Sequence, residues 1–215
     1  PPTICPAATR PKARYTGQNR IRPQTTMTRS NSNMHAVIEK IQRIFNERGA
    51  NQYGTEAVTQ LEHALQSGEL AEASSAPQSL VIASMLHDIG HIFHGSELPG
   101  NYEDNLDDKH EFVANAWLKE HFGPEVADPI RLHVAAKRYL CTRQPSYEDA
   151  LSPTSRKSYH DQGGPMSPEE MTSFESEPHY REALELRRWD DLAKETEKET
   201  PSLQHFLPAL ESCLN

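Results

Sequence analysis

The chain has 215 residues and a formal net charge of −9, with 35% hydrophobic and 25% charged residues. This length favours one domain with a substantial core. No apolar run approaches the roughly 18 residues that cross a bilayer, and an acidic chain lacks the basic face that non-specific nucleic-acid binding requires, so we expect neither a membrane nor a nucleic-acid partner.

The N-terminal segment 1–33 differs from the rest in charge. It contains six basic residues and no acidic residue. Its prolines oppose the amphipathic helix of an organelle-targeting peptide, so we expect a disordered basic leader, or a start assigned upstream of Met27 or Met34. The folded domain is then expected to cover 34–215, and targeting by the leader is the less favoured alternative.

Beyond Met34 the apolar residues recur at helical spacing. Expected helices cover about 37–45, 55–66, 78–87, 107–121 and 124–141. A loop is expected at 95–106 and a polar stretch at 152–167, followed by a long helical pattern at 168–199 that is broken near Pro178 and an amphipathic tail at 203–210. No convincing strand pattern occurs, so the predicted fold class is all-α.

The cysteines indicate the redox environment. Cys5, Cys141 and Cys213 are far apart and lack the spacing of a thiolate metal site. An odd number of dispersed cysteines does not suggest a disulfide scaffold, which fits a reducing compartment, and we expect a cytoplasmic protein.

The strongest chemical feature is the pair His87-Asp88 at the end of the apolar segment 80–86. A carboxylate that loses its water on folding needs a cation or hydrogen-bond donors in exchange. An isolated His-Asp pair is more often a simple helix end than a metal site, because short motifs occur by chance.

Further imidazoles and a second carboxylate on other expected helices change this assessment. The candidate metal ligands are His63, His87, Asp88, His110, His133 and Asp190. Six such ligands can hold two divalent metals if one carboxylate, most simply Asp88, bridges them, and nitrogen and oxygen ligands suit iron, manganese or zinc.

The order of these ligands resembles that of the HD-domain superfamily of helical metalloproteins, over about residues 34–200. Within it, Tyr53-Gly54-Thr55-Glu56 followed by Leu61-Glu62-His63 is similar to the mixed-valent di-iron oxygenases that cleave 1-hydroxy-2-aminoethylphosphonates and, more distantly, to myo-inositol oxygenase. The resemblance implies an HD-domain helical bundle with two iron ions (Fe²⁺/Fe³⁺) and O₂ as co-substrate.

The resemblance also implies roles for residues near the substrate. Tyr53 would cap one iron until substrate displaces it, and Glu56 would partner the displaced tyrosine and the amino end of the substrate. The positions assigned to the phosphonate side are His91, Lys137, Ser155, Ser158 and Arg187.

Helical spacing gives independent support to two of these positions. Lys137 lies four residues after His133 and Arg187 three before Asp190, so each shares a helix face with a candidate ligand. Taken alone, Lys137 would more simply be a solvated lysine, and Tyr53 and Glu56 would more simply be a packed loop tyrosine and a first-turn glutamate.

Two enzymatic hypotheses remain open. The first is oxidative cleavage of the carbon–phosphorus bond of 2-amino-1-hydroxyethylphosphonate to glycine and phosphate, or of its trimethylammonio analogue to glycine betaine and phosphate. The alternative is a metal-dependent phosphohydrolase acting on nucleotides or phosphoesters, which would use the same metal ligands. A small phosphonate is the expected partner; the sequence gives no oligomeric state, and a monomer is compatible with it.

Overall fold

A computed structural model describes the backbone of residues 25–93 and 107–215 and the side chains of residues 32–93 and 114–215. The elements are α1 (Thr25–Arg48), α2 (Gln60–Ala73), α3 (Gln78–Leu86), the 3₁₀ helix η1 (Ile89–Ile92), α4 (Asp107–Phe122), α5 (Pro124–Arg143), α6 (Pro145–Ala150), α7 (Pro153–Asp161), α8 (Pro168–Ser176), α9 (Tyr180–Leu192) and α10 (Leu203–Ser212). The described residues form no strand beyond one isolated bridge, Gln52 to Thr59, which confirms the all-α prediction.

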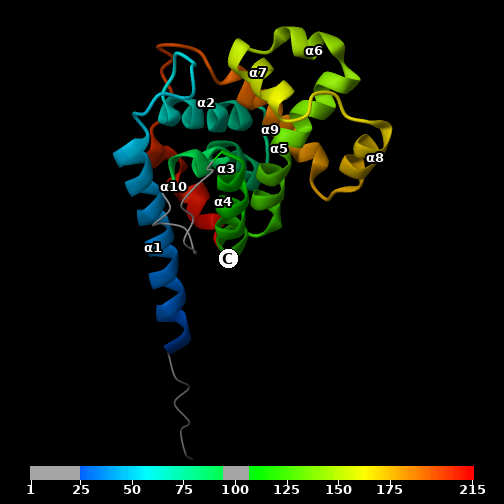
Figure 1. The fold of residues 1–215 in the computed structure, drawn as a ribbon. Coiled ribbons are helices and arrows are strands. Elements are labelled where there is room, and N and C mark those ends of the chain that lie inside the picture. The colour runs from blue at the N-terminus through cyan, green and yellow to red at the C-terminus, as the bar shows by residue number, and fades with distance from the viewer. Residues whose placement is uncertain (1–24, 94–106) are drawn as a thin grey trace, which may run out of the picture.

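Helix α3 forms the centre of the bundle. Every residue from Leu80 to Leu86 is buried, and each large apolar side chain buried in this way contributes about 1.5–3 kcal/mol. Helices α2 and α5 pack against α3, and α9 packs along α5. In Figure 1, α1 and α10 cover one side of this centre and α6 to α8 form a lobe on the other. The site residues are carried by the central helices.

The sequence placed several boundaries incorrectly, and capping explains the clearest case. Helix α2 begins at Gln60 rather than near Thr55, because Thr59 forms a capping box with Glu62: its hydroxyl accepts from the Glu62 amide at 3.2 Å, and the Glu62 carboxylate accepts from the Thr59 amide at 2.7 Å. Residues 55–59 therefore stay in the loop. Helix α1 begins at Thr25, upstream of the boundary expected at Met34.

The polar stretch 152–167, in which no helix was predicted, contains α7 with Ser152 as N-cap and Pro153 in the first turn. The long pattern from 168 is interrupted near Pro178, as expected, with His179 in the left-handed conformation at φ 61°. It ends at Leu192 rather than near Glu199, so residues 193–202 cross the bundle without helical structure.

The loop predicted at 95–106 and most of the leader lie outside the described residues. Within the part of the chain that the structure describes, no helix has the length and apolar character that a bilayer span requires.

Candidate metal centre

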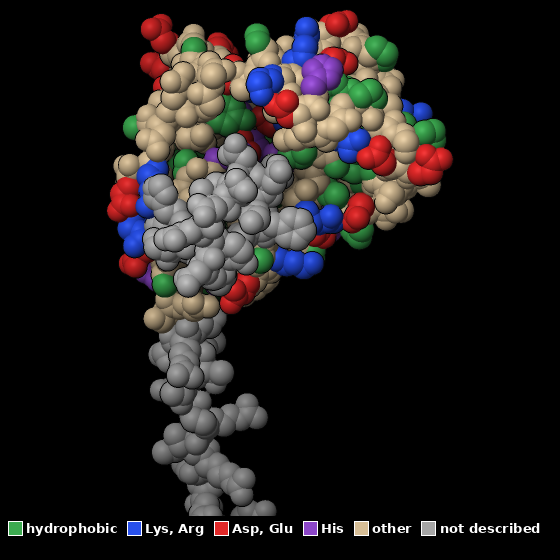
Figure 2. Space-filling view, in the orientation of Figure 1, with side chains coloured by type: hydrophobic (Ala, Val, Ile, Leu, Met, Phe, Trp, Pro, Cys, Tyr) green, Lys and Arg blue, Asp and Glu red, His purple; other side chains and the backbone are tan. Residues whose placement is uncertain are grey.

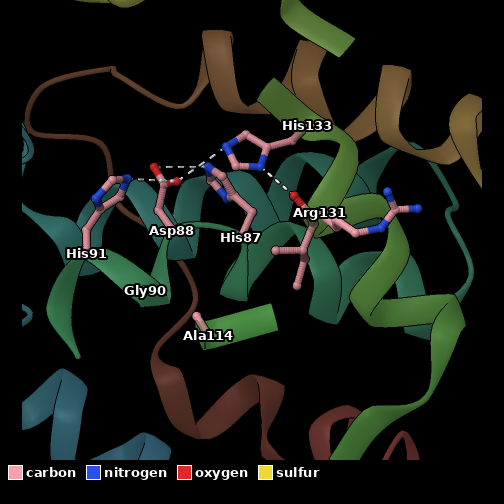
Figure 3. A pocket seen from close by; sticks show the side chains of 8 residues that line it. His87, Asp88, Gly90, His91, Ala114, Arg131 and His133 are labelled. Atoms are coloured by element: carbon pink, nitrogen blue, oxygen red, sulfur yellow. Dashed lines mark hydrogen bonds and ion pairs between the residues drawn. The ribbon is translucent and has the colours of Figure 1, made fainter. Parts of the chain in front are cut away.

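Four helices and a short 3₁₀ turn bring imidazole and carboxylate groups to one buried point. His63 comes from α2, His87 from the end of α3, Asp88 from the turn before η1, His133 from α5 and Asp190 from α9. All five are nine-tenths or more buried. Ligand atoms of His63, His87 and Asp88 lie within 4.8 Å of one another, and Figure 3 shows Asp88 between the rings of His87, His91 and His133.

Backbone carbonyls fix the orientation of the three buried histidines. The Nδ1 atoms of His63, His87 and His133 lie 2.8, 2.8 and 2.6 Å from the carbonyl oxygens of Ala193, Ser84 and Ile130. With Nδ1–H donating to a carbonyl, each neutral ring turns its unprotonated Nε2 toward the cluster. This tautomer is the one that a metal ion requires.

The carboxylates complete a donor set that fits metal ions. Both side-chain oxygens of Asp190 are buried without a hydrogen bond of good geometry among the described residues, although Nη1 of Arg187 lies 2.6 Å from Oδ2. Unsatisfied buried carboxylate oxygens are costly unless a cation compensates them. His63 and His87 place Nε2 atoms 3.4 and 3.6 Å from these oxygens, so the same space is lined by nitrogen and oxygen donors.

Asp88 lies between two groups of ligands. Its Oδ2 is 3.3 Å from Nε2 of His87 and 3.8 Å from Nε2 of His63, whereas its Oδ1 is 3.6 Å from Nε2 of His133. Each carboxylate oxygen therefore faces a different side of the cluster. This is the arrangement that a carboxylate bridging two cations needs.

The electrostatic field of the cluster favours positive charge. Burial alone would lower the pKa of His87, but the neighbouring carboxylates of Asp88 and Asp190 raise it well above its ordinary value. Burial would raise the pKa of Asp88, yet His87 and His91 lower it well below its ordinary value. A site that attracts protons onto histidine in this way equally attracts metal cations.

The segment that connects α1 to α2 closes one side of the cluster. Tyr53 stacks on His63 with ring centroids 3.8 Å apart, and burial together with the charges of Asp190 and Asp88 raises the pKa of its phenol well above the ordinary value. Its carbonyl accepts from the Glu56 amide at 2.9 Å, which closes a turn around Gly54 at φ +55°. The turn holds Tyr53 and Glu56 at the same edge of the site.

A cationic side chain lies on the neighbouring wall. Lys137, on α5, is only 3% exposed and donates to the Ser158 hydroxyl on α7 at 2.6 Å. Burial, and then the charge of Arg187, lowers the pKa of its ammonium group to about 8. The ammonium is therefore charged at neutral pH. It lies between Ser158 of α7 and the cluster.

Arg187 contacts protein carboxylates with all of its nitrogen atoms. Its Nη1 approaches Asp190, while Nε and Nη2 donate to the carboxylate of Asp191, with Nε at 2.9 Å. Its place in the structure is thus behind the candidate ligand Asp190, and its predicted contact with a phosphonate stays a prediction. Ser155 is buried in the first turns of α7, and its hydroxyl accepts from Lys194 at 2.7 Å.

The remaining predicted residues are placed as follows. His91, 38% exposed in η1, has Nε2 3.6 Å from Oδ1 of Asp88. The side chain of His110 lies outside the described residues; its position in α4 is one turn before Ala114, which lines the pocket with His87, Asp88, His91 and His133. Figure 2 shows histidine side chains, drawn in purple, inside a hollow in the upper part of the molecule.

Two contributors were not predicted from the sequence. Lys194 donates to Ser155 and lies 3.5 Å from Glu56 Oε1. Gln66, buried on α2, makes two hydrogen bonds with the backbone of Glu195, at 2.8 and 3.0 Å. Neither residue belongs to a recognisable motif. The one signal in the sequence is spacing, because Lys194 follows Asp190 by four residues, as Lys137 follows His133.

Comparison with known proteins finds close relatives. No model of a protein family matches the chain. It is 39% identical over 183 residues to a [1-hydroxy-2-(trimethylamino)ethyl]phosphonate dioxygenase (glycine-betaine-forming) of Leisingera caerulea, covering 85% of this chain and 92% of the relative. It is 45% identical over 159 residues to a hydroxymethylphosphonate dioxygenase of Gimesia maris, covering 74% and 79% respectively. An uncharacterised protein of Acanthamoeba polyphaga mimivirus is 36% identical over 180 residues.

Proposed function

Because the chain belongs to the family of phosphonate dioxygenases, we propose that it is a di-iron oxygenase that cleaves the carbon–phosphorus bond of a 1-hydroxyalkylphosphonate. The observation that carries this proposal is Asp88, whose two oxygens face separate histidine groups in a buried cluster. Candidate substrates are 2-amino-1-hydroxyethylphosphonate, its trimethylammonio analogue and hydroxymethylphosphonate.

Two iron ions would be held by His63, His87, Asp88 and Asp190 on one side and by Asp88, His133 and His110 on the other. Bound there, they supply activation of O₂ and of the substrate hydroxyl, chemistry that no side chain of the chain provides. In the overall reaction the hydroxyl-bearing carbon is oxidised to a carboxylate, the carbon–phosphorus bond breaks and phosphate leaves. O₂ is the oxidant, and both of its atoms are needed to balance the products.

The protein's own residues bind and orient the substrate. Lys137 donates to a phosphonate oxygen in a charge-assisted hydrogen bond to a dianion. Helix α7, whose Ser158 contacts Lys137, covers the phosphonate with Ser155 and Ser158. Tyr53 fills the side of the cluster next to His63, so that water is excluded until substrate enters. Arg187 holds Asp190 in position through its ion pair.

The test is phosphate release measured with and without oxygen. The iron-loaded protein is expected to release phosphate from at least one of the three candidate compounds only when O₂ is present, with one O₂ consumed for each phosphate. Equal release under strict anaerobiosis would instead identify a phosphohydrolase, the alternative that shares the metal ligands.

Tyr53→Phe tests the role of the tyrosine in the substrate-free enzyme. Because the ring stacks on His63 and its phenol feels the charges of Asp190 and Asp88, removal of this hydroxyl is expected to change the visible absorption and electron paramagnetic resonance of the bound iron. The control is Tyr139→Phe, since the hydroxyl of Tyr139 bonds Glu175 at 2.5 Å, outside the cluster. Identical spectra for Tyr53→Phe and the unsubstituted protein would contradict the capping role.

A further inference from the structure

Asp191 is a second aspartate beside the metal cluster, and the reaction described above does not use it. It follows the candidate ligand Asp190 on α9, and its side chain is only 14% exposed. Both aspartates contact the buried guanidinium of Arg187, which lies one turn earlier on the same helix. One cation is therefore shared between a carboxylate of the cluster and the carboxylate next to it.

The aligned hydrogen bonds of Arg187 go to Asp191. Its Nε donates to Oδ2 at 2.9 Å and its Nη2 donates to Oδ1, the two-pronged geometry that a guanidinium and a carboxylate favour. The contact with Asp190 is different, because Nη1 lies 2.6 Å from Oδ2 while neither oxygen of Asp190 has a hydrogen bond of good geometry among the described residues. Asp191 therefore takes the directional bonds of the guanidinium, and Asp190 takes the attraction of its charge.

A residue on another helix fixes Asp191. Tyr147, on α6, donates its hydroxyl to Oδ2 of Asp191 at 2.6 Å. Burial, and then the charge of Asp191, raises the pKa of this phenol, so it keeps its proton and acts as the donor. The ammonium of Lys194 lies 4.0 Å from Oδ1 on the other side. Both oxygens of Asp191 thus have partners, and Arg187 cannot turn without breaking its two bonds to this carboxylate.

The orientation of Arg187 determines which oxygen of Asp190 a metal ion can use. If the two prongs of the guanidinium turned to Asp190, a buried bidentate ion pair would occupy both of its oxygens. In the structure Nη1 approaches Oδ2, whereas Oδ1 lies 3.4 Å from Nε2 of His63. We propose, on the basis of the function proposed above, that Asp191 is a positioning residue of the metal centre, which holds Arg187 so that Oδ1 of Asp190 stays available to a metal ion.

The role is tested without turnover by titrating Mn²⁺ into the metal-free full-length protein and following it by electron paramagnetic resonance. Asp191→Asn keeps the shape of the side chain but removes its charge and one acceptor oxygen, which releases one prong of Arg187. Hydrogen-bond partners of metal ligands typically contribute 10–100-fold to metal affinity, so the Kd of one of the two ions should rise at least about tenfold while the other changes by less than about twofold. Tyr147→Phe, which frees the carboxylate from α6, should raise the same Kd by a smaller factor.

Glu185→Gln is the matched control, because Glu185 also lies on α9 and pairs with an arginine, Arg188 at 2.5 Å, but is half exposed to solvent; it should bind both ions like the unsubstituted protein. Asp190→Asn removes the ligand through which Asp191 acts, so adding Asp191→Asn to it should leave the Kd of the remaining ion unchanged. Unchanged Kd values in Asp191→Asn alone, or an equal weakening of both ions, would overturn the inference. If Asp191→Asn does not fold, Tyr147→Phe decides it, and an unchanged Kd there counts against the role.

The two proposals fail differently. If the unsubstituted protein binds fewer than two Mn²⁺ ions per chain, the two-metal centre of the proposed function is wrong and the inference falls with it. If it binds two ions but releases no phosphate with O₂, the proposed activity is rejected and the role of Asp191 is still decided by the Kd values. If both ions bind and phosphate is released with O₂, but Asp191→Asn leaves the Kd values unchanged, only the positioning role of Asp191 is rejected.

Discussion

Asp88→Asn is expected to release both metal ions together and to reduce phosphate formation by about 10³-fold or more. The carboxylate lies between the two histidine groups, with Oδ2 facing His87 and Oδ1 facing His133, so its replacement by an amide weakens both sites at once. Metal ions contribute several kcal/mol to transition-state stabilisation, and about 4 kcal/mol corresponds to a factor of 10³. Metal content per chain, measured by elemental analysis after dialysis, gives the direct readout.

Asp128→Asn serves as the control for this substitution. Asp128 is also a buried aspartate, on α5, but its partner is Arg131 at 3.7 Å rather than the cluster histidines. This variant should retain the metal content of the unsubstituted protein. Loss of one metal ion only, or full retention, in Asp88→Asn would show that the carboxylate does not bridge two ions.

Lys137→Met is expected to lower kcat/KM for the phosphonate by about 100-fold, mainly through KM. A buried ammonium that pairs with a dianion makes a charge-assisted hydrogen bond, and its loss costs about 2–3 kcal/mol. Lys157→Met is the matched control, because Lys157 lies on the exposed face of α7 and pairs with Asp161. Equal KM values for the two variants would remove Lys137 from substrate binding.

The same lysine predicts a pH dependence. Burial and the charge of Arg187 lower the pKa of Lys137 to about 8. The side chain is charged below this pH and neutral above it, so kcat/KM should fall as the pH rises through about 8. Bound phosphonate stabilises the charged form and raises its pKa, so kcat should fall only at higher pH. The decline of kcat/KM near pH 8 should be absent from the residual activity of Lys137→Met.

The sequence by itself determined the helical class and the chemical character of the site. Apolar spacing is a local property, and it identified the buried helix α3 and the break at Pro178 because burial of one helix face and the geometry of proline act over a few residues. The five described ligand candidates were identified from the sequence, and the structure brings them to one point.

Only the tertiary structure decided which charged groups meet. Local capping at Thr59 and Ser152 moved the start of α2 and turned part of the polar stretch into α7. Packing of the crossing segment against α2 then placed Lys194 beside Glu56 and Ser155. Such contacts join segments far apart in the chain, and their energy depends on distance and burial, which helical periodicity does not encode. The sequence therefore predicted a metal site, whereas the pairing of charged side chains around it required the fold.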